Sequence, residues 1–145
     1  MHDRTITFLL TGSKGAQLAP LTAEQPKVLI PFGGLFRVLD FSLSNVLNSQ
    51  LRQVYLLTHD HPERVNAYVR EGWAQLSREF RWDRGEDLVC APPVSSAAGY
   101  LPYVENSRAE NVLVVSGDQI YQMDYSKLIK RHTEVQADVT VLATR

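Results

Sequence analysis

A loop that contains two glycines is the first feature of this chain that could do chemistry. An apolar, β-branched run at residues 5–11 leads into a short loop with Gly12, Lys14 and Gly15. Glycines let a backbone come close to a ligand, and backbone amides beside a lysine suit a triphosphate. An ordinary turn after a strand explains the same spacing, so both interpretations stay open at this point.

Two charged side chains elsewhere could complete such a site. Lys27 lies between Pro26 and an apolar run, where it could meet a phosphate as a point charge, although a solvated loop lysine is the simpler interpretation. Asp118 follows an apolar run and Gly117. A carboxylate at that point can hold Mg²⁺ on a nucleotide, and an aspartate that caps a turn fits the pattern equally well.

Alternating strand and helix signals surround these residues. Apolar and β-branched runs predict strands at 5–11, 53–58, 112–116 and 138–143. Helical spacing and helix-start signals predict helices at 36–49, 62–70 and 126–134, and residues 74–98 match no single pattern. This order predicts an α/β fold with a mostly parallel sheet and helices on both faces. Ligands of such sheets sit beyond the carboxyl ends of the strands, where the loops at 12–18 and 117–121 are expected.

Composition excludes several classes of function. The chain has 145 residues, of which 44% are hydrophobic and 21% charged, and its net charge is −1. This balance gives no electrostatic reason to expect nucleic acid or a membrane surface as a partner. No apolar run approaches the roughly 18 residues of a membrane helix, and no signal peptide is visible. Cys90 is the only cysteine, so no internal disulfide can form and a cytoplasmic location is expected.

The whole pattern resembles the N-terminal part of the ADP-glucose pyrophosphorylase (glucose-1-phosphate adenylyltransferase) family. The matching stretches are in the family's order and cover nearly the whole chain. They read LAPLT at 18–22, PK at 26–27, PFGG at 31–34, FRVLDF at 36–41, LSN at 43–45, NS at 48–49, REGW at 70–73 and SGDQIYQMDY at 116–125.

The resemblance implies a Rossmann-like nucleotidyltransferase domain that is followed in the family by a left-handed β-helix. Residues 1–145 would then be a partial nucleotidyltransferase domain without the β-helix. The family joins ATP and glucose 1-phosphate to give ADP-glucose and pyrophosphate, with Mg²⁺, in glycogen or starch synthesis. The partners implied are therefore ATP or ADP-glucose and glucose 1-phosphate, together with further subunits in a homo- or hetero-oligomer.

The same resemblance assigns roles to individual residues. Lys27 matches a catalytic lysine, and Asp118 matches the catalytic aspartate that binds the metal, whereas the second metal ligand lies outside this chain. The expected nucleotide-binding residues are Leu10, Gly12, Ser13, Lys14, Gly15, Gln17, Ser96 and Gly117.

Several positions depart from the family pattern. Ser13 replaces a loop glycine, and Gln17 replaces an arginine whose charge would stabilise the pyrophosphate leaving group, a loss of several kcal/mol. Ala98 stands in place of an aspartate that contacts the nucleotide, and Leu35 in place of a lysine linked to activators. Pro102 falls inside an expected helix, which predicts that this helix is shorter or displaced.

Three hypotheses follow. The favoured one is a catalytically impaired domain that binds nucleotide or serves as a non-catalytic subunit, because of Gln17 and Ala98. The retained Lys27 and Asp118 support an alternative, in which the chain is an active adenylyltransferase when completed by the missing part. An interaction module without nucleotide binding is the third. A truncated sheet would also leave an apolar edge uncovered, which predicts self-association.

Overall fold

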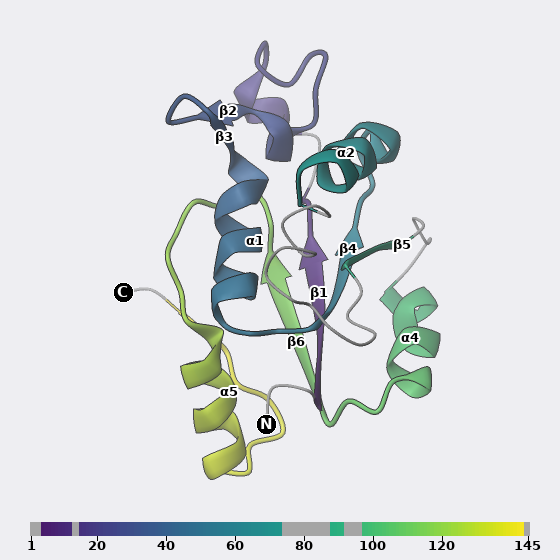
Figure 1. The fold of residues 1–145 in the computed structure, drawn as a ribbon, viewed down its shortest axis with the longest axis vertical. Coiled ribbons are helices and arrows are strands. Elements are labelled where there is room, and N and C mark those ends of the chain that lie inside the picture. The colour runs from purple at the N-terminus through teal and green to yellow at the C-terminus, as the bar shows by residue number, and fades with distance from the viewer. Residues whose placement is uncertain (1–3, 13–14, 74–87, 92–96, 144–145) are drawn as a thin grey trace.

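A parallel sheet of four strands forms the centre of the molecule (Figure 1). The computed structural model describes residues 4–12, 15–73, 88–91 and 97–143. The strands are β1 (Thr5–Leu10), β4 (Gln53–Leu57), β5 (Leu88–Ala91) and β6 (Asn111–Ser116), in the order β5-β4-β1-β6. Every neighbouring pair in this sheet is parallel, so the predicted Rossmann-like α/β fold is confirmed.

Alternating side chains of the strands build a core on each face of the sheet. Leu9 and Leu56 belong to the larger cluster, which α1, α2 and α5 cover, whereas Ile6 and Phe8 point to the opposite face. Tyr100 and the partly buried Tyr103, from the segment that includes α4, pack on that second face. Full burial of each large apolar side chain contributes roughly 1.5–3 kcal/mol, which holds the helices against both faces of the sheet.

The helices predicted at 36–49, 62–70 and 126–134 are present to within a few residues, and the structure describes one further short helix. They are α1 (Val38–Asn48), α2 (Pro62–Tyr68), which continues into a π-helical turn (Val69–Trp73), α4 (Leu101–Asn106) and α5 (Tyr125–Glu134). Pro102 lies in the first turn of α4, where its missing N–H removes no helical hydrogen bond. The proline therefore favours a helix that begins at Leu101, after a 3₁₀ turn (Ala97–Tyr100). In the described part of the chain, no helix combines the length and apolarity needed to cross a membrane.

Short elements connect β1 to α1. Two 3₁₀ turns (Ala16–Leu18 and Lys27–Leu29) precede a small antiparallel hairpin of β2 (Pro31–Phe32) and β3 (Phe36–Arg37). Gly33 and Gly34 form its turn with φ of 65° and 94°, a conformation that favours glycine. The hairpin ends at Arg37, directly before α1 begins.

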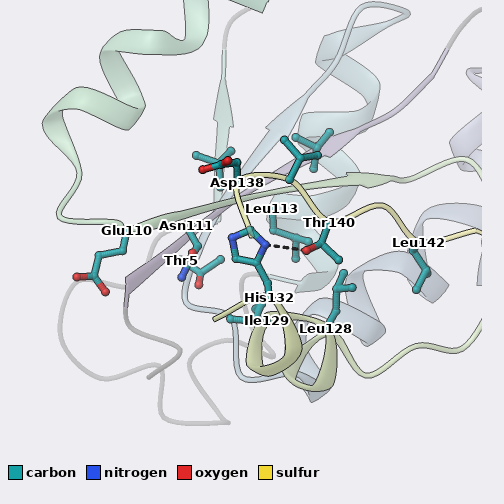
Figure 2. A pocket seen from close by; sticks show the side chains of 13 residues that line it. Thr5, Glu110, Asn111, Leu113, Leu128, Ile129, His132, Asp138, Thr140 and Leu142 are labelled. Carbon is teal, nitrogen blue, oxygen red and sulfur yellow. Dashed lines mark hydrogen bonds between the residues drawn. The ribbon is translucent and has the colours of Figure 1, made fainter. Parts of the chain in front are cut away.

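Two expectations for the sheet were incomplete or wrong. β5 lies within the range that matched no pattern, and it pairs with β4. Residues 138–143 form no strand, contrary to prediction, and Val139 and Val141 are 78% and 80% exposed. The segment has strand propensity but no ladder partner in the described chain, and Thr140 instead hydrogen-bonds His132 of α5 at 2.8 Å (Figure 2).

Candidate functional site

The loops after β1 and β6 meet at the carboxyl end of the sheet. The amide of Gly117 donates to the carbonyl of Leu10 at 2.6 Å, which continues the pairing of the two strands beyond β6. Asp118 therefore lies beside the start of the glycine loop. A Cβ added to Gly12 would sit 2.4 Å from Asp118 Oδ2, so only glycine fits at this position without displacing the carboxylate.

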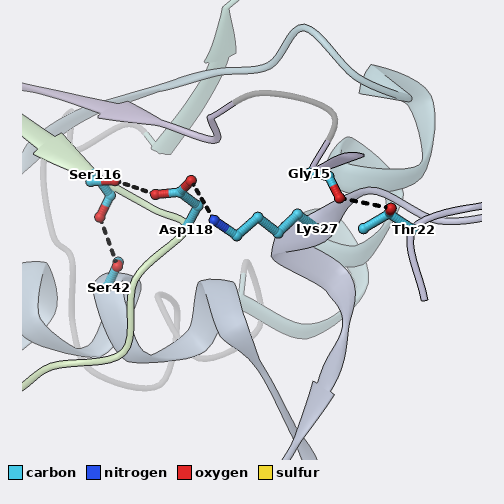
Figure 3. A network of polar contacts seen from close by, with 6 residues as sticks. All are labelled: Gly15, Thr22, Lys27, Ser42, Ser116 and Asp118. Carbon is cyan, nitrogen blue, oxygen red and sulfur yellow. Dashed lines mark hydrogen bonds and ion pairs between the residues drawn. The ribbon is translucent and has the colours of Figure 1, made fainter. Parts of the chain in front are cut away.

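Lys27 completes this meeting point. Its Nζ lies 3.0 Å from Asp118 Oδ2, across 91 residues of sequence (Figure 3). The following residues, Val28 and Leu29, are buried in the main core, which fixes the lysine's backbone. The side chains of Lys27 and Asp118 are 28% and 17% exposed, so the ion pair is only partly shielded from solvent.

The electrostatic surroundings keep Asp118 ionised. Burial alone would raise the pKa of Asp118, but hydrogen bonds from Ser116 and Lys27, with the charge of Lys27, outweigh it and lower that pKa. Ser116 Oγ donates to Oδ1 while Lys27 donates to Oδ2, so each carboxylate oxygen has a donor. Asp118 is therefore a carboxylate anion whose charge is paired with that of Lys27.

The glycine loop packs on the lysine stem. Gly15 has φ of 63°, and a Cβ there would lie 3.2 Å from the Cβ of Lys27. Thr22 Oγ1 donates to the carbonyl of Gly15 at 3.1 Å and so holds this part of the loop. Gly15 and Asp118 thus lie on the same side of the molecule, bridged by Lys27.

The other residues expected to bind nucleotide either form no hydrogen bond with the ion pair between Lys27 and Asp118 in the described part of the chain or lie outside the described residues. Leu10 ends β1 and is 39% exposed, and Gln17 is exposed in the first 3₁₀ turn. Among the residues that the structure describes, Gln17 forms no hydrogen bond with the Lys27–Asp118 pair. Ser13, Lys14 and Ser96 lie outside the described residues, so their predicted roles stay predictions.

Helix α1 contributes polar residues whose role the sequence did not reveal. Ser42 Oγ donates to the carbonyl of Ser116 at 3.0 Å. Asn45 donates to the carbonyl of Tyr121 at 2.9 Å and accepts from the amide of Met123 at 3.2 Å. Ser49 Oγ, on the next turn, accepts from the amide of Tyr125 at 2.8 Å. These side chains fix the segment that carries Asp118 from the end of β6 to the start of α5.

A signal for this arrangement was present in the sequence. Ser42 and Asn45 of α1 and its C-cap Ser49 recur at helical spacing, and all three are buried. Buried polar groups need hydrogen-bond partners, so their spacing indicates a polar segment packed along the helix. The spacing alone did not indicate that this segment is the one from the end of β6 to the start of α5.

Asp40 anchors a second element to α1. Its carboxylate accepts from the amide of Arg37 at 2.7 Å, from the Tyr68 hydroxyl at 2.7 Å and from Trp73 Nε1 at 2.7 Å. Burial, followed by the hydrogen bond and charge of Asp40, raises the pKa of Tyr68 well above its usual range. The segment from α2 through the π-helical turn is therefore held against the N-terminus of α1.

The donor set at Asp118 fits a cation that arrives with phosphates. Mg²⁺ is commonly held by one or two carboxylates and by the oxygens of a bound phosphate. In the part of the chain that the structure describes, no three histidine, cysteine, aspartate or glutamate side chains cluster to hold a metal alone. Within the described residues, Asp118 would thus supply one ligand to a cation, and another molecule would have to supply the others.

Sequence comparison identifies the family. A model of the nucleotidyl transferase family matches residues 6–145. The chain belongs to this family. It is 36% identical over 99% of its length to a glucose-1-phosphate adenylyltransferase of Geobacter metallireducens, and 34% identical over 94% to glucose-1-phosphate adenylyltransferase 2 of Vibrio vulnificus.

This member covers only part of its relatives. The chain spans 37% of the Geobacter protein and 36% of the Vibrio protein. A glucose-1-phosphate adenylyltransferase of Koribacter versatilis gives the same result, with 34% identity over 94% of this chain and 35% of the relative. The resemblance found in the sequence motifs is confirmed by these matches.

Proposed function

We propose that this domain binds a nucleoside triphosphate with its Mg²⁺ between the loop at 12–18 and Asp118, and that its catalysis is impaired. The convergence of Gly12, Lys27 and Asp118 at the carboxyl ends of β1 and β6 carries the proposal. The names of the relatives support ATP as the nucleotide and glucose 1-phosphate as the second substrate. When bound, Mg²⁺ would neutralise negative charge on the phosphate oxygens.

Each residue would have a defined task. Lys27 would neutralise a phosphate as a point charge, and Asp118 would hold the cation-bearing phosphates in place. The glycines at 12 and 15 would let the backbone approach the phosphates. In the adenylyl transfer, a sugar phosphate oxygen would attack the α-phosphorus in line while the bond from the α-phosphorus to the bridging oxygen of the β-phosphate breaks and pyrophosphate leaves. Catalysis would therefore depend on positioning and on charge neutralisation.

Impairment is proposed because charge is missing where it would be needed. Gln17 is neutral at the position where the family carries arginine, and Ala98 lacks a carboxylate. A charged donor to the leaving group typically contributes several kcal/mol to transition-state stabilisation. We therefore propose a nucleotide-binding or non-catalytic subunit role, in the cytoplasm and within a homo- or hetero-oligomer.

Calorimetry with ATP and MgCl₂ tests the binding. We expect saturable heat for the native chain, a clear loss of affinity for Asp118→Asn, and none for Asp138→Asn, which changes an exposed carboxylate elsewhere. The absence of heat at millimolar nucleotide would leave the interaction module as the better hypothesis.

A pyrophosphate-release assay with ATP and glucose 1-phosphate tests the impairment. We expect little or no turnover for the native chain and a gain when arginine and aspartate replace Gln17 and Ala98 together. Rapid turnover by the native chain would support the alternative of an active adenylyltransferase. Turnover that appears only when a complementary segment is added would support completion by the missing part.

A further inference from the structure

The ion pair between Lys27 and Asp118 raises a question about which ligands the site accepts. Asp118 receives hydrogen bonds on both oxygens, from Ser116 on Oδ1 and from Lys27 on Oδ2. Its negative charge is therefore already balanced by a resident cation at 3.0 Å. A carboxylate in this state is a poor ligand for a free divalent cation, because the ammonium group occupies one oxygen and repels the newcomer.

The geometry gives Lys27 limited but useful freedom. Its backbone is held by the buried residues that follow it, and its stem lies under Gly15, whose added Cβ would be 3.4 Å from the lysine Cδ. Within the described residues, Asp118 is the only hydrogen-bond partner of the ammonium group. Lys27 can therefore release the carboxylate by moving its end, without any change in the core.

Such a release is favourable only when Lys27 gains another anion. A phosphate-bearing ligand offers that anion, and its cation can then take the place of Lys27 at Asp118. A free cation offers no new partner to Lys27, so its binding would leave the ammonium unpaired in a partly shielded site. A free cation brings only positive charge, whereas a cation bound to a phosphate-bearing ligand also brings an anion for Lys27. The ion pair between Lys27 and Asp118 would therefore favour the second ligand over the first.

We propose that Lys27 is a specificity-determining residue, which makes this site reject free divalent cations and accept them only with a phosphate-bearing ligand. The inference rests on the proposed nucleotide binding and adds a selectivity to it. It requires opposite effects on two ligands when the charge at position 27 is removed. A lysine that only stabilises the fold would not produce this reversal.

Mn²⁺ as a probe makes the reversal measurable with the full 145-residue chain. Electron paramagnetic resonance measures the free Mn²⁺, and broadening of the Gly117 amide signal in NMR reports a cation at Asp118. For Lys27→Met we expect affinity for Mn²⁺ alone to rise by about tenfold or more, as for removal of one close charge. Affinity for Mn²⁺–ATP should fall in the same variant.

Three further variants make the result specific. Lys127→Met removes an exposed lysine from α5 and should change neither affinity. Lys27→Arg keeps the charge and should still exclude free Mn²⁺, which gives a reading even if Lys27→Met folds poorly in circular dichroism. Adding Asp118→Asn to Lys27→Met should abolish the gained Mn²⁺ binding and so place it at this carboxylate.

The outcomes separate this proposal from the function beneath it. Unchanged affinity for free Mn²⁺ in Lys27→Met would overturn the selectivity, and so would a gain for both ligands. The selectivity would also be overturned if Lys27→Arg bound free Mn²⁺ as much more tightly than the native chain as Lys27→Met does. Failure of the native chain to bind Mn²⁺–ATP at all would overturn the proposed nucleotide binding itself.

Discussion

The backbone of Gly12 is in contact range of the Asp118 carboxylate, with room for a hydrogen atom but not for a methyl group. This contact joins the two loops of the candidate site, because Gly12 follows β1 and Asp118 follows β6. The parallel pairing of β1 with the edge strand β6 brings the two loops together, and the amide of Gly117 maintains the register beyond the strands. The site is thus a consequence of strand order.

Substitution of Gly12 by alanine tests this contact. Gly12 has φ of 76°, and its added Cβ would collide with Asp118 Oδ2 at 2.4 Å. We expect a loss of about 1–3 kcal/mol in the free energy of unfolding, measured in urea, and weaker ATP binding. Gly33→Ala is the matched control, because Gly33 has φ of 65° but nothing near its Cβ. Equal effects of the two variants on ATP binding would contradict the contact.

Acid should weaken the fold through Asp118. Its pKa is lowered in the folded chain from the ordinary value of 3.8, so its ion pair stabilises the fold above that pH. This contribution is lost as the pH falls below 3.8 and through the lowered pKa. We expect the native and Asp118→Asn chains to differ in their free energy of urea unfolding at pH 7, and this difference to shrink as the pH falls below 3.8. A difference that grows on acidification would contradict the sign of this pKa shift.

The role of α1 in holding the Asp118 segment is tested at Asn45. Alanine there would leave the carbonyl of Tyr121 and the amide of Met123 without this partner. Loss of partners for buried groups costs about 1–3 kcal/mol, and we expect a destabilisation of that size with altered NMR shifts at residues 117–123. Asn48→Ala, on the exposed side of the same helix, should be nearly neutral. If the NMR shift changes in Asn45→Ala were confined to α1, the proposed role of Asn45 in holding residues 117–123 would be contradicted.

The sequence predicted those parts of the fold that depend on local pattern. The buried run of β1 and the apolar spacing of α1 come from residues that decide their own conformation, and both were placed to within a few residues. The meeting of Gly12 with Asp118 followed from the general rule for parallel sheets. The individual interactions of Lys27 and Asn45 did not, because each depends on a partner at least 76 residues away.

The predictions that were wrong or missing concern elements that depend on their neighbours. The β-branched residues around Val139 and Val141 have the propensity of a strand, yet a strand also needs a ladder partner. β5 shows the opposite case, in which pairing with β4 establishes a strand that the local pattern did not indicate. Local propensity alone cannot predict either outcome.

Self-association through β6 is the remaining prediction. β6 pairs with β1 on one side and with no strand on its other side in the described chain, and Val112 and Val114 are 51% and 60% exposed. Beside it lies a cavity of about 510 Å³, lined by residues of β6, α5 and the segment 138–142 (Figure 2). An unpaired edge next to exposed apolar side chains favours pairing with a second chain.

Sedimentation velocity should therefore show a mean mass that rises with protein concentration. Val114→Lys places a charge beside the free edge and should shift the chain towards monomer, by the same reasoning that charged residues protect natural sheet edges. Leu35→Lys is the matched control, because Leu35 is 93% exposed in the hairpin turn, far along the chain from β6. A native chain that stays monomeric at all concentrations would contradict the prediction, and a monomerising effect of Leu35→Lys alone would place the contact at the hairpin instead.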